Sequence, residues 1–256
     1  MEPWNPSEYM RFGDERTRPS VDLASRIAID LPANVIDLGC GPGNSTRILR
    51  RRWPGAKVVG LDSSPQMIDS ARAKEPNEEW FVSAIEDWAP DSAFDVVFSN
   101  SALQWLPDHR SLVERLFDRV APGGALAFQI PSLPYATVHT LIHELALDGP
   151  WAPRMAGPLS EITMESPGFY YNSLAGEARS IDMWQTEYFH VMNSTVTIVD
   201  WIASTGLRPF LDALESQDET RLFLSRLQER IDDSYRPQAD ERVLFPFKRT
   251  FVVAYR

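Results

Sequence analysis

Three glycines and an aspartate in the first quarter of the chain have the types and the spacing of a nucleotide-cofactor site. Gly39, Gly41 and Gly43 follow directly on the apolar run that begins at Val35. Glycines at such a point let the backbone turn sharply and approach a ligand that any Cβ would exclude. Asp62 ends the next apolar run, where an acid can accept hydrogen bonds from both hydroxyls of an adenosyl ribose. The pattern predicts a strand, a glycine loop and a helix that hold an adenosyl cofactor.

Asp37 separates the two cofactors that this spacing accommodates. An NAD-binding site would place a pyrophosphate against the glycine loop, where a neighbouring carboxylate would repel it. The ammonium group of S-adenosylmethionine (SAM) is instead attracted to a carboxylate, directly or through water. Because Asp37 precedes the first glycine, the sequence favours SAM. A tight strand-to-helix turn that binds no ligand is the alternative interpretation.

Further cofactor contacts are expected in the loops after the first four predicted strands, since ligands of an open α/β sheet bind beyond the carboxyl ends of its strands. Met67 either lies against the adenine or packs in the core. The adenine amino group is predicted to form its hydrogen bond with the backbone of Ala84 and Ile85 or with the Glu86 side chain. The complete predicted set is Asp37, Gly39, Gly41, Asp62, Ser63, Met67, Ala84, Ile85, Asn100 and Leu103.

Strand and helix patterns alternate along the first half of the chain. Short valine-rich runs are typical of strands buried in a parallel sheet, and the segments between them have helical spacing or helix-capping residues. Strands are predicted at 34–38, 57–61, 79–83, 94–99, 125–130, 181–192 and 247–255, and helices at 20–29, 44–52, 64–74, 110–120 and 136–147, with two or three more between 196 and 235. This alternation predicts an α/β fold with a doubly wound, mostly parallel sheet.

The length of 256 residues suits a single domain that spans 1–256. Residues 1–33 are predicted to form an N-terminal arm with a helix ahead of the first strand. The segment at 131–180 is rich in proline, glycine and aromatic residues and breaks the alternation. We interpret 131–180 and 196–246 as substrate-recognition or lid insertions.

Composition limits the partners. The formal net charge of −11 at pH 7 gives a surface potential that repels nucleic acids and anionic membranes. The opening residues lack the pattern of a signal peptide and no apolar run is long enough to span a bilayer, so a cytoplasmic protein is expected. A monomer is predicted as well. Cys40 is the only cysteine, which excludes an internal disulfide and a cysteine-rich metal site. His139 and His143 lie one helical turn apart without a third ligand, so no metal is expected.

The loop after the fourth predicted strand, which begins at Asn100, lacks the groups that methyl transfer to a base would use. It has no Asn/Asp-Pro-Pro-Tyr run to grip a flipped adenine, and Cys40 lies in the wrong loop for a cytosine-directed nucleophile. With no evident metal, nucleophile or base, the favoured acceptor is a carboxylate, which is already ionised at pH 7. Positioning then carries the reaction and no catalytic residue is predicted. The alternatives are an amine, phenol or carbanion acceptor, or a SAM-binding regulator without turnover.

A small polycarboxylate needs cationic and aromatic side chains to hold it on an acidic protein. Screening over about 8 Å at physiological salt lets a local arginine cluster outweigh the net charge, although most single arginines are solvated surface charges. The predicted substrate-binding residues are Trp4, Arg16, Trp105, Arg154, Tyr171 and Arg208, with Trp151, Tyr170 and Trp184 as further aromatic candidates.

The sequence resembles one family over nearly its full length, the trans-aconitate 2-methyltransferases of bacteria. The specific matches lie at the two ends: Trp4–Ser7 with Tyr9, Phe12, Glu15–Arg16 and Arg18–Pro19, and Asp200–Trp201 with Thr205–Pro209. Asp37–Thr46, Asp62–Pro65 and Gln104–His109 match as well, but these runs occur across many methyltransferases. The resemblance implies monomethyl esterification of trans-aconitate by SAM. It also implies a seven-stranded sheet of order 3-2-1-4-5-7-6 whose two late strands pair antiparallel at one edge.

Overall fold

A seven-stranded sheet organises the protein in the computed structural model, which describes residues 11–132 and 136–256. The strand order is β3-β2-β1-β4-β5-β7-β6, which confirms the order expected from the resemblance. The parallel strands are β1 (Asn34–Leu38), β2 (Lys57–Asp62), β3 (Glu79–Val82), β4 (Phe94–Asn100) and β5 (Val120–Pro131), and the late strands are β6 (Ser180–Met192) and β7 (Val243–Tyr255).

β7 runs antiparallel to β5. The Ser132 N–H donates to the Lys248 carbonyl, while the Arg256 N–H donates to the carbonyl of Gly124, near the other end of β5. When the residue numbers of hydrogen-bonded partners rise along one strand and fall along the other, the two strands are antiparallel. β7 is therefore an antiparallel strand beside the parallel part of the sheet, while the sense of its pairing with β6 stays a prediction.

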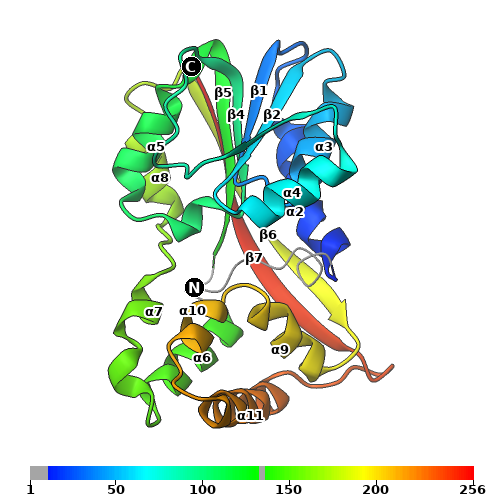
Figure 1. The fold of residues 1–256 in the computed structure, drawn as a ribbon, viewed down its shortest axis with the longest axis vertical. Helices are drawn as coiled ribbons and strands as arrows, with labels where there is room; N and C mark the ends of the chain where they lie inside the picture. The colour runs from blue at the N-terminus through cyan, green and yellow to red at the C-terminus, as the bar shows by residue number, and fades with distance from the viewer. Residues whose placement is uncertain (1–10, 133–135) are drawn as a thin grey trace. The chain divides into compact units, whose positions relative to one another are not determined.

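Helices cover both faces of the parallel strands (Figure 1). α2 (Gly13–Arg26), α3 (Asn44–Arg52) and α4 (Pro65–Lys74) lie on one face, and α5 (His109–Phe117) and α8 (Pro167–Leu174) lie on the other. Capping fixes where α4 and α8 begin. Ser64 accepts from the Met67 N–H and Ser166 from the Phe169 N–H, and a proline follows each serine at the first helical position.

Several predicted boundaries are wrong: β7 begins at Val243 rather than 247 and α5 ends at Phe117 rather than 120. At two further boundaries tertiary packing overrides local breakers. α2 begins at Gly13 rather than near residue 20 and contains Pro19. Its Leu23 and Ala24 are buried, and the helix packs against α3, which compensates for the backbone hydrogen bond that proline cannot donate. β5 begins at 120 rather than 125: Phe94 pairs with Val120 and Val96 with Ala125, so the residues at 121–124 form a bulge inside a continuous strand.

The described chain separates into two compact units. The larger unit comprises 11–130, 165–185 and 250–256, and contains the parallel strands. The smaller comprises 131–132, 136–164 and 186–249. Its helices are α6 (Thr137–Leu147), η3 (Ala152–Arg154), α7 (Ala156–Ser160), α9 (Thr195–Ala203), α10 (Arg208–Asp212) and α11 (Gln217–Ser234). Residues 165–180, predicted as part of an insertion, are thus assigned to the larger unit.

Aromatic packing forms the core of the smaller unit. The Trp151 ring is fully buried, donates from Nε1 to the Leu145 carbonyl at 2.8 Å, and meets the Phe223 ring edge-on at 4.9 Å. Tyr170, in the larger unit, is also fully buried. Both residues are therefore core residues, and the prediction of aromatic substrate walls was wrong for them.

No described helix has the length and apolar character needed to cross a membrane.

Candidate active site

The glycine loop lies between β1 and α3. Gly39 has φ +71°, and a Cβ there would lie 2.2 Å from the Cβ of Ala102, so the loop packs too closely against its neighbour for any other residue. Gly41 also has a positive φ, but a Cβ there would meet no atom within 4 Å. The backbone at Gly41 therefore borders open space, which is what close approach by a ligand requires.

Asp62, at the end of β2, holds this loop in place. Its Oδ2 accepts from the Gly41 N–H at 2.8 Å and its Oδ1 from the Ser64 N–H at 2.9 Å. Burial raises the pKa of the Asp62 carboxyl, and these two backbone hydrogen bonds oppose the rise. Because each carboxylate oxygen can accept a second hydrogen bond, acceptor capacity remains for a diol. The sequence analysis did not predict this hydrogen bond to Gly41, which links the glycine loop to the acid at the end of β2.

Asp37 carries an unsatisfied carboxylate oxygen. The side chain is fully buried, and Oδ2 accepts from the hydroxyls of Ser45 and Thr46, both at 2.6 Å. Oδ1 has no hydrogen-bond partner among the described residues. Burial raises the pKa of Asp37 from 3.8 to about 6, against the lowering effect of the two hydroxyls, and the nearby Asp62 raises it further. An orphaned acidic oxygen in this position fits an ammonium group, so the residues present fit SAM.

A narrow pocket beside the glycine loop brings Arg16 and Asn100 together. Its lining includes Arg16 from α2, Gly39 and Cys40 from the loop, and Asn100 from the end of β4. Arg16 is only 7% exposed, and its guanidinium lies 5.7 Å from the centre of the Phe12 ring. A buried cation at this place is suited to a carboxylate. Arg16 was among the predicted substrate-binding residues, but no sequence pattern placed it beside the glycine loop.

The remaining predicted cofactor residues occupy different environments. Ser63 is exposed, whereas Met67 is buried in α4 and Leu103 in η1 (Leu103–Trp105). The Ile85 carbonyl already accepts from the Arg115 guanidinium, and the Ala84 carbonyl accepts from the Ser83 hydroxyl. The backbone groups predicted for the adenine are therefore partly engaged, and their assignment stays a prediction.

The predicted substrate residues are distributed over both units. Trp105 is half-buried and Tyr171 is 51% exposed, both in the larger unit, and Arg208 begins α10 in the smaller one. Arg154 forms ion pairs with Glu215 and Glu219 and donates to the Ala213 carbonyl, which is a local structural role. Trp4 lies outside the described residues, and Trp184 stacks on Phe251 with ring centres 4.7 Å apart.

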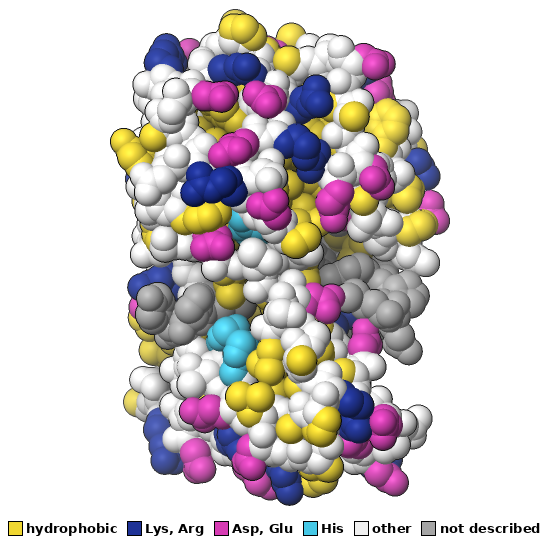
Figure 2. Space-filling view, turned by 90° about the vertical axis from the view of Figure 1, so that its left-hand side faces the viewer, with side chains coloured by type: hydrophobic (Ala, Val, Ile, Leu, Met, Phe, Trp, Pro, Cys, Tyr) yellow, Lys and Arg dark blue, Asp and Glu magenta, His cyan; other side chains and the backbone are white. Residues whose placement is uncertain are grey.

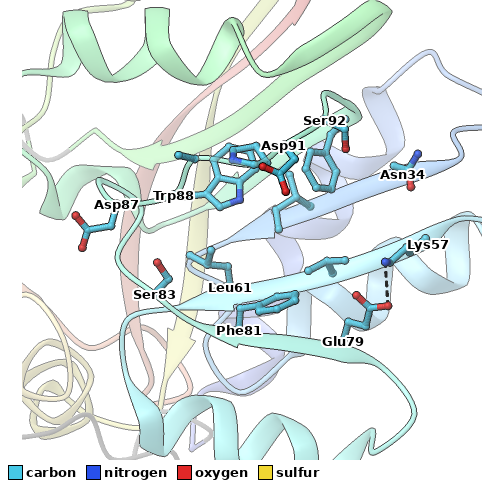
Figure 3. A pocket seen from close by; sticks show the side chains of 15 residues that line it. Asn34, Lys57, Leu61, Glu79, Phe81, Ser83, Asp87, Trp88, Asp91 and Ser92 are labelled. Carbon is cyan, nitrogen blue, oxygen red and sulfur yellow. Dashed lines mark ion pairs between the residues drawn. The ribbon is translucent and has the colours of Figure 1, made fainter.

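A larger hollow of about 460 Å³ lies away from these strand ends (Figure 3). Its floor is the face of β1–β3, from Asn34 and the Lys57–Glu79 ion pair to Phe81, and the loop that carries Trp88 closes one side. Ligands of open α/β sheets bind beyond the carboxyl ends of the strands rather than on the sheet face. The narrower pocket at the glycine loop is therefore the candidate active site.

Histidine, cysteine and carboxylate side chains are the groups with which the described chain could hold a metal ion. Within the described residues, no group of three or more His, Cys, Asp or Glu is arranged to hold a metal ion. His139 and His143, in the smaller unit, have ring centres 3.9 Å apart, and burial together with His143 lowers the pKa of His139 to about 4. Basic and acidic side chains are interspersed on the face shown in Figure 2 rather than gathered into one patch.

Comparisons with known proteins agree with this geometry. A family model described as a methyltransferase domain matches residues 35–124. The trans-aconitate 2-methyltransferase of Azoarcus sp. (strain BH72) is 45% identical over 256 residues, which cover 100% of each chain. Among solved structures, the YcgJ protein of Bacillus subtilis is similar with a TM-score of 0.61 at 15% identity, covering 93% of this chain and 98% of that one.

The sheet order, the glycine loop and the acids at the ends of β1 and β2 define a class I methyltransferase, an enzyme class that takes its methyl group from SAM. Within that class, the identity over the full length of its relatives is decisive. The chain belongs to the trans-aconitate 2-methyltransferase family.

Proposed function

We propose that the protein transfers the methyl group of SAM to a carboxylate of trans-aconitate and so forms a monomethyl ester. The observation that carries the proposal is the narrow pocket in which the buried Arg16 guanidinium lies beside the glycine loop. It combines a seat for the donor with a cation for a carboxylate. The name and full-length identity of the relatives support the same substrate.

The donor is assigned to the loops after β1 and β2. Asp37 faces the ammonium end through its unsatisfied Oδ1, and the Gly39–Gly41 backbone admits the ligand without a steric clash. Asp62 offers its remaining lone pairs to the ribose hydroxyls. Ser63, Met67, Ala84, Ile85, Asn100 and Leu103 complete the proposed set.

The bound sulfonium supplies an electrophilic methyl group, and the protein supplies alignment. A carboxylate has a pKa near 4 and needs no base to become nucleophilic at pH 7. Holding two reactants in line can lower a barrier by about 7 to 11 kcal/mol. No catalytic residue is therefore proposed, because binding and orientation are sufficient.

Arg16, Trp105, Tyr171 and Arg208 are the proposed acceptor contacts. Arg154 stays in the proposal only if its ion pairs with Glu215 and Glu219 open. We further propose that 131–180 and 196–246 recognise the substrate, and that the enzyme is a cytoplasmic monomer. Self-repulsion at a net charge of −11 supports the monomeric state, and light scattering after size-exclusion chromatography tests it.

Incubation with methyl-labelled SAM and trans-aconitate tests the reaction. A carboxyl ester releases its label as methanol in mild alkali, whereas an N-, C- or ether-linked methyl does not. Label that resists alkali would support another acceptor chemistry, and no transfer to any acceptor would favour a SAM-binding regulator.

The Arg16→Ala variant tests the assigned carboxylate contact. A lost charged hydrogen bond is worth about 1.5 to 3 kcal/mol, so the acceptor KM should rise at least tenfold while affinity for S-adenosylhomocysteine is retained. Arg154→Ala serves as the comparison, since it should lower thermal stability first. A selective loss of S-adenosylhomocysteine affinity would instead assign Arg16 to the carboxylate of the donor.

A further inference from the structure

Ser101 adopts a backbone conformation that serine rarely takes. It follows the last residue of β4 and has φ +56°, in the left-handed region that side chains with a Cβ disfavour. Such residues persist only where their surroundings over-determine them, and they concentrate at functional sites. Ser101 directly follows Asn100, which lines the pocket at the glycine loop.

Hydrogen bonds to two glutamines hold Ser101 in this conformation. Its N–H donates to the Gln129 carbonyl at 2.9 Å and its hydroxyl donates to Gln129 Oε1 at 2.8 Å. Its own carbonyl accepts from Gln104 Nε2 at 2.9 Å. Gln129 is fully buried in β5 and Gln104 is 5% exposed in η1. Two glutamines from different elements therefore form hydrogen bonds with one strained residue. We name Ser101, Gln104 and Gln129 the serine clamp.

Asn100 is the residue that the serine clamp orients. It pairs with Gln129 in the register of β4 and β5, and its Oδ1 is buried without a hydrogen-bond partner among the described residues. A buried acceptor without a partner is costly and calls for an explanation such as a bound ligand. The backbone turn at Ser101 fixes the end of β4, and with it the direction in which the Asn100 amide projects.

We propose that Ser101, Gln104 and Gln129 are positioning residues that aim the Asn100 side-chain carbonyl at a hydrogen-bond donor on the bound SAM. This inference rests on the donor seat proposed above, and it adds three residues outside that seat. The serine clamp then acts on donor affinity through Asn100, without itself contacting the ligand.

A double-mutant cycle on the dissociation constant of S-adenosylhomocysteine, measured by isothermal titration calorimetry, tests the proposal. Ser101→Ala and Gln129→Met each break the hydroxyl–amide bond, and each should weaken binding about tenfold. The double variant should bind within twofold of the weaker single variant, because both changes remove the same contact. Single effects below twofold, or effects that multiply, would overturn the proposal.

Ser101→Gly separates positioning from stability. Glycine adopts φ +56° without strain, so this variant should have a higher thermal midpoint than Ser101→Ala and yet lose the same affinity. Affinity that instead follows the thermal midpoint across the variants would assign the clamp a structural role only. Ser173→Ala, which removes a hydroxyl bond to the Phe169 carbonyl in α8, is the control and should bind as the wild type does. Because binding is measured directly, the result does not depend on trans-aconitate being the acceptor, and a wild-type protein that does not bind would remove the donor seat itself.

Discussion

Replacement of Asp37 by asparagine should stabilise the ligand-free protein and weaken its affinity for the donor. The carboxyl is fully buried, and burial raises its pKa from 3.8 to about 6. At neutral pH the protein therefore holds a buried charge whose Oδ1 has no partner among the described residues. The Asp37→Asn amide would keep an acceptor for Ser45 and Thr46 while removing that charge.

The pKa difference sets the magnitude and the pH window. At about 1.4 kcal/mol per pKa unit, the rise from 3.8 to about 6 corresponds to about 3 kcal/mol as an upper bound. The folded state binds the proton more tightly than the unfolded state does. The wild type should therefore lose stability as the pH rises from about 4 to about 6 and level off above that. The gain from Asp37→Asn should be largest at neutral pH and shrink toward pH 4.

Urea denaturation at several pH values measures this difference, with the exposed Asp91→Asn as the control. Calorimetry with S-adenosylhomocysteine, which retains the amino group, should show at least a tenfold loss of affinity for Asp37→Asn, because an amide cannot balance an ammonium charge. A variant no more stable than the wild type at pH 7, or a gain that does not shrink on acidification, would refute the reasoning about burial. Undiminished affinity would separate Asp37 from the donor's ammonium group.

Two further substitutions test how the site is built. Gly39→Ala should destabilise the protein by about 2 to 5 kcal/mol, because it combines a positive φ with a Cβ placed 2.2 Å from Ala102. In Gly41→Ala the new Cβ meets no atom within 4 Å, so this variant should lose only about 1 to 2 kcal/mol. Equal losses of the two variants in chemical denaturation would contradict the packing argument. Tyr170→Phe should lower the free energy of unfolding by about 1 to 3 kcal/mol, since the fully buried hydroxyl is the hydrogen-bond partner of His109 Nδ1. A loss below about 0.5 kcal/mol in urea denaturation would show that His109 finds another partner.

The parts of the site that the sequence predicts are those encoded in contiguous residues. The run from Asp37 to Gly43 and the acid at Asp62 have a spacing that only a strand, a turn and a helix accommodate, and the structure has these elements with β2 ending at Asp62. The alternation of strands and helices likewise predicts the doubly wound sheet. Each of these inferences depends on local chemistry and on short separations along the chain.

What the sequence does not reveal depends on contacts between distant residues. Gln129 in β5 and Ser101, directly after β4, are joined by a hydrogen bond, and no pattern around either residue marks the contact. Arg16 lies at the glycine loop because α2 begins earlier and continues through Pro19, where a local rule ends the helix. The burial that raises the pKa of Asp37 is likewise a property of the assembled core.

In the proposed reaction, a carboxylate oxygen of the acceptor attacks the methyl group of SAM directly. Trans-aconitate with ¹⁸O in its carboxyl groups tests this claim, because alkaline hydrolysis of an ester breaks the acyl–oxygen bond and leaves the ester oxygen in the released methanol. If the reaction proceeds in this way, the released methanol carries ¹⁸O at the enrichment of the substrate. Methanol that carries ¹⁶O, or a methyl group that alkali does not release, would contradict it.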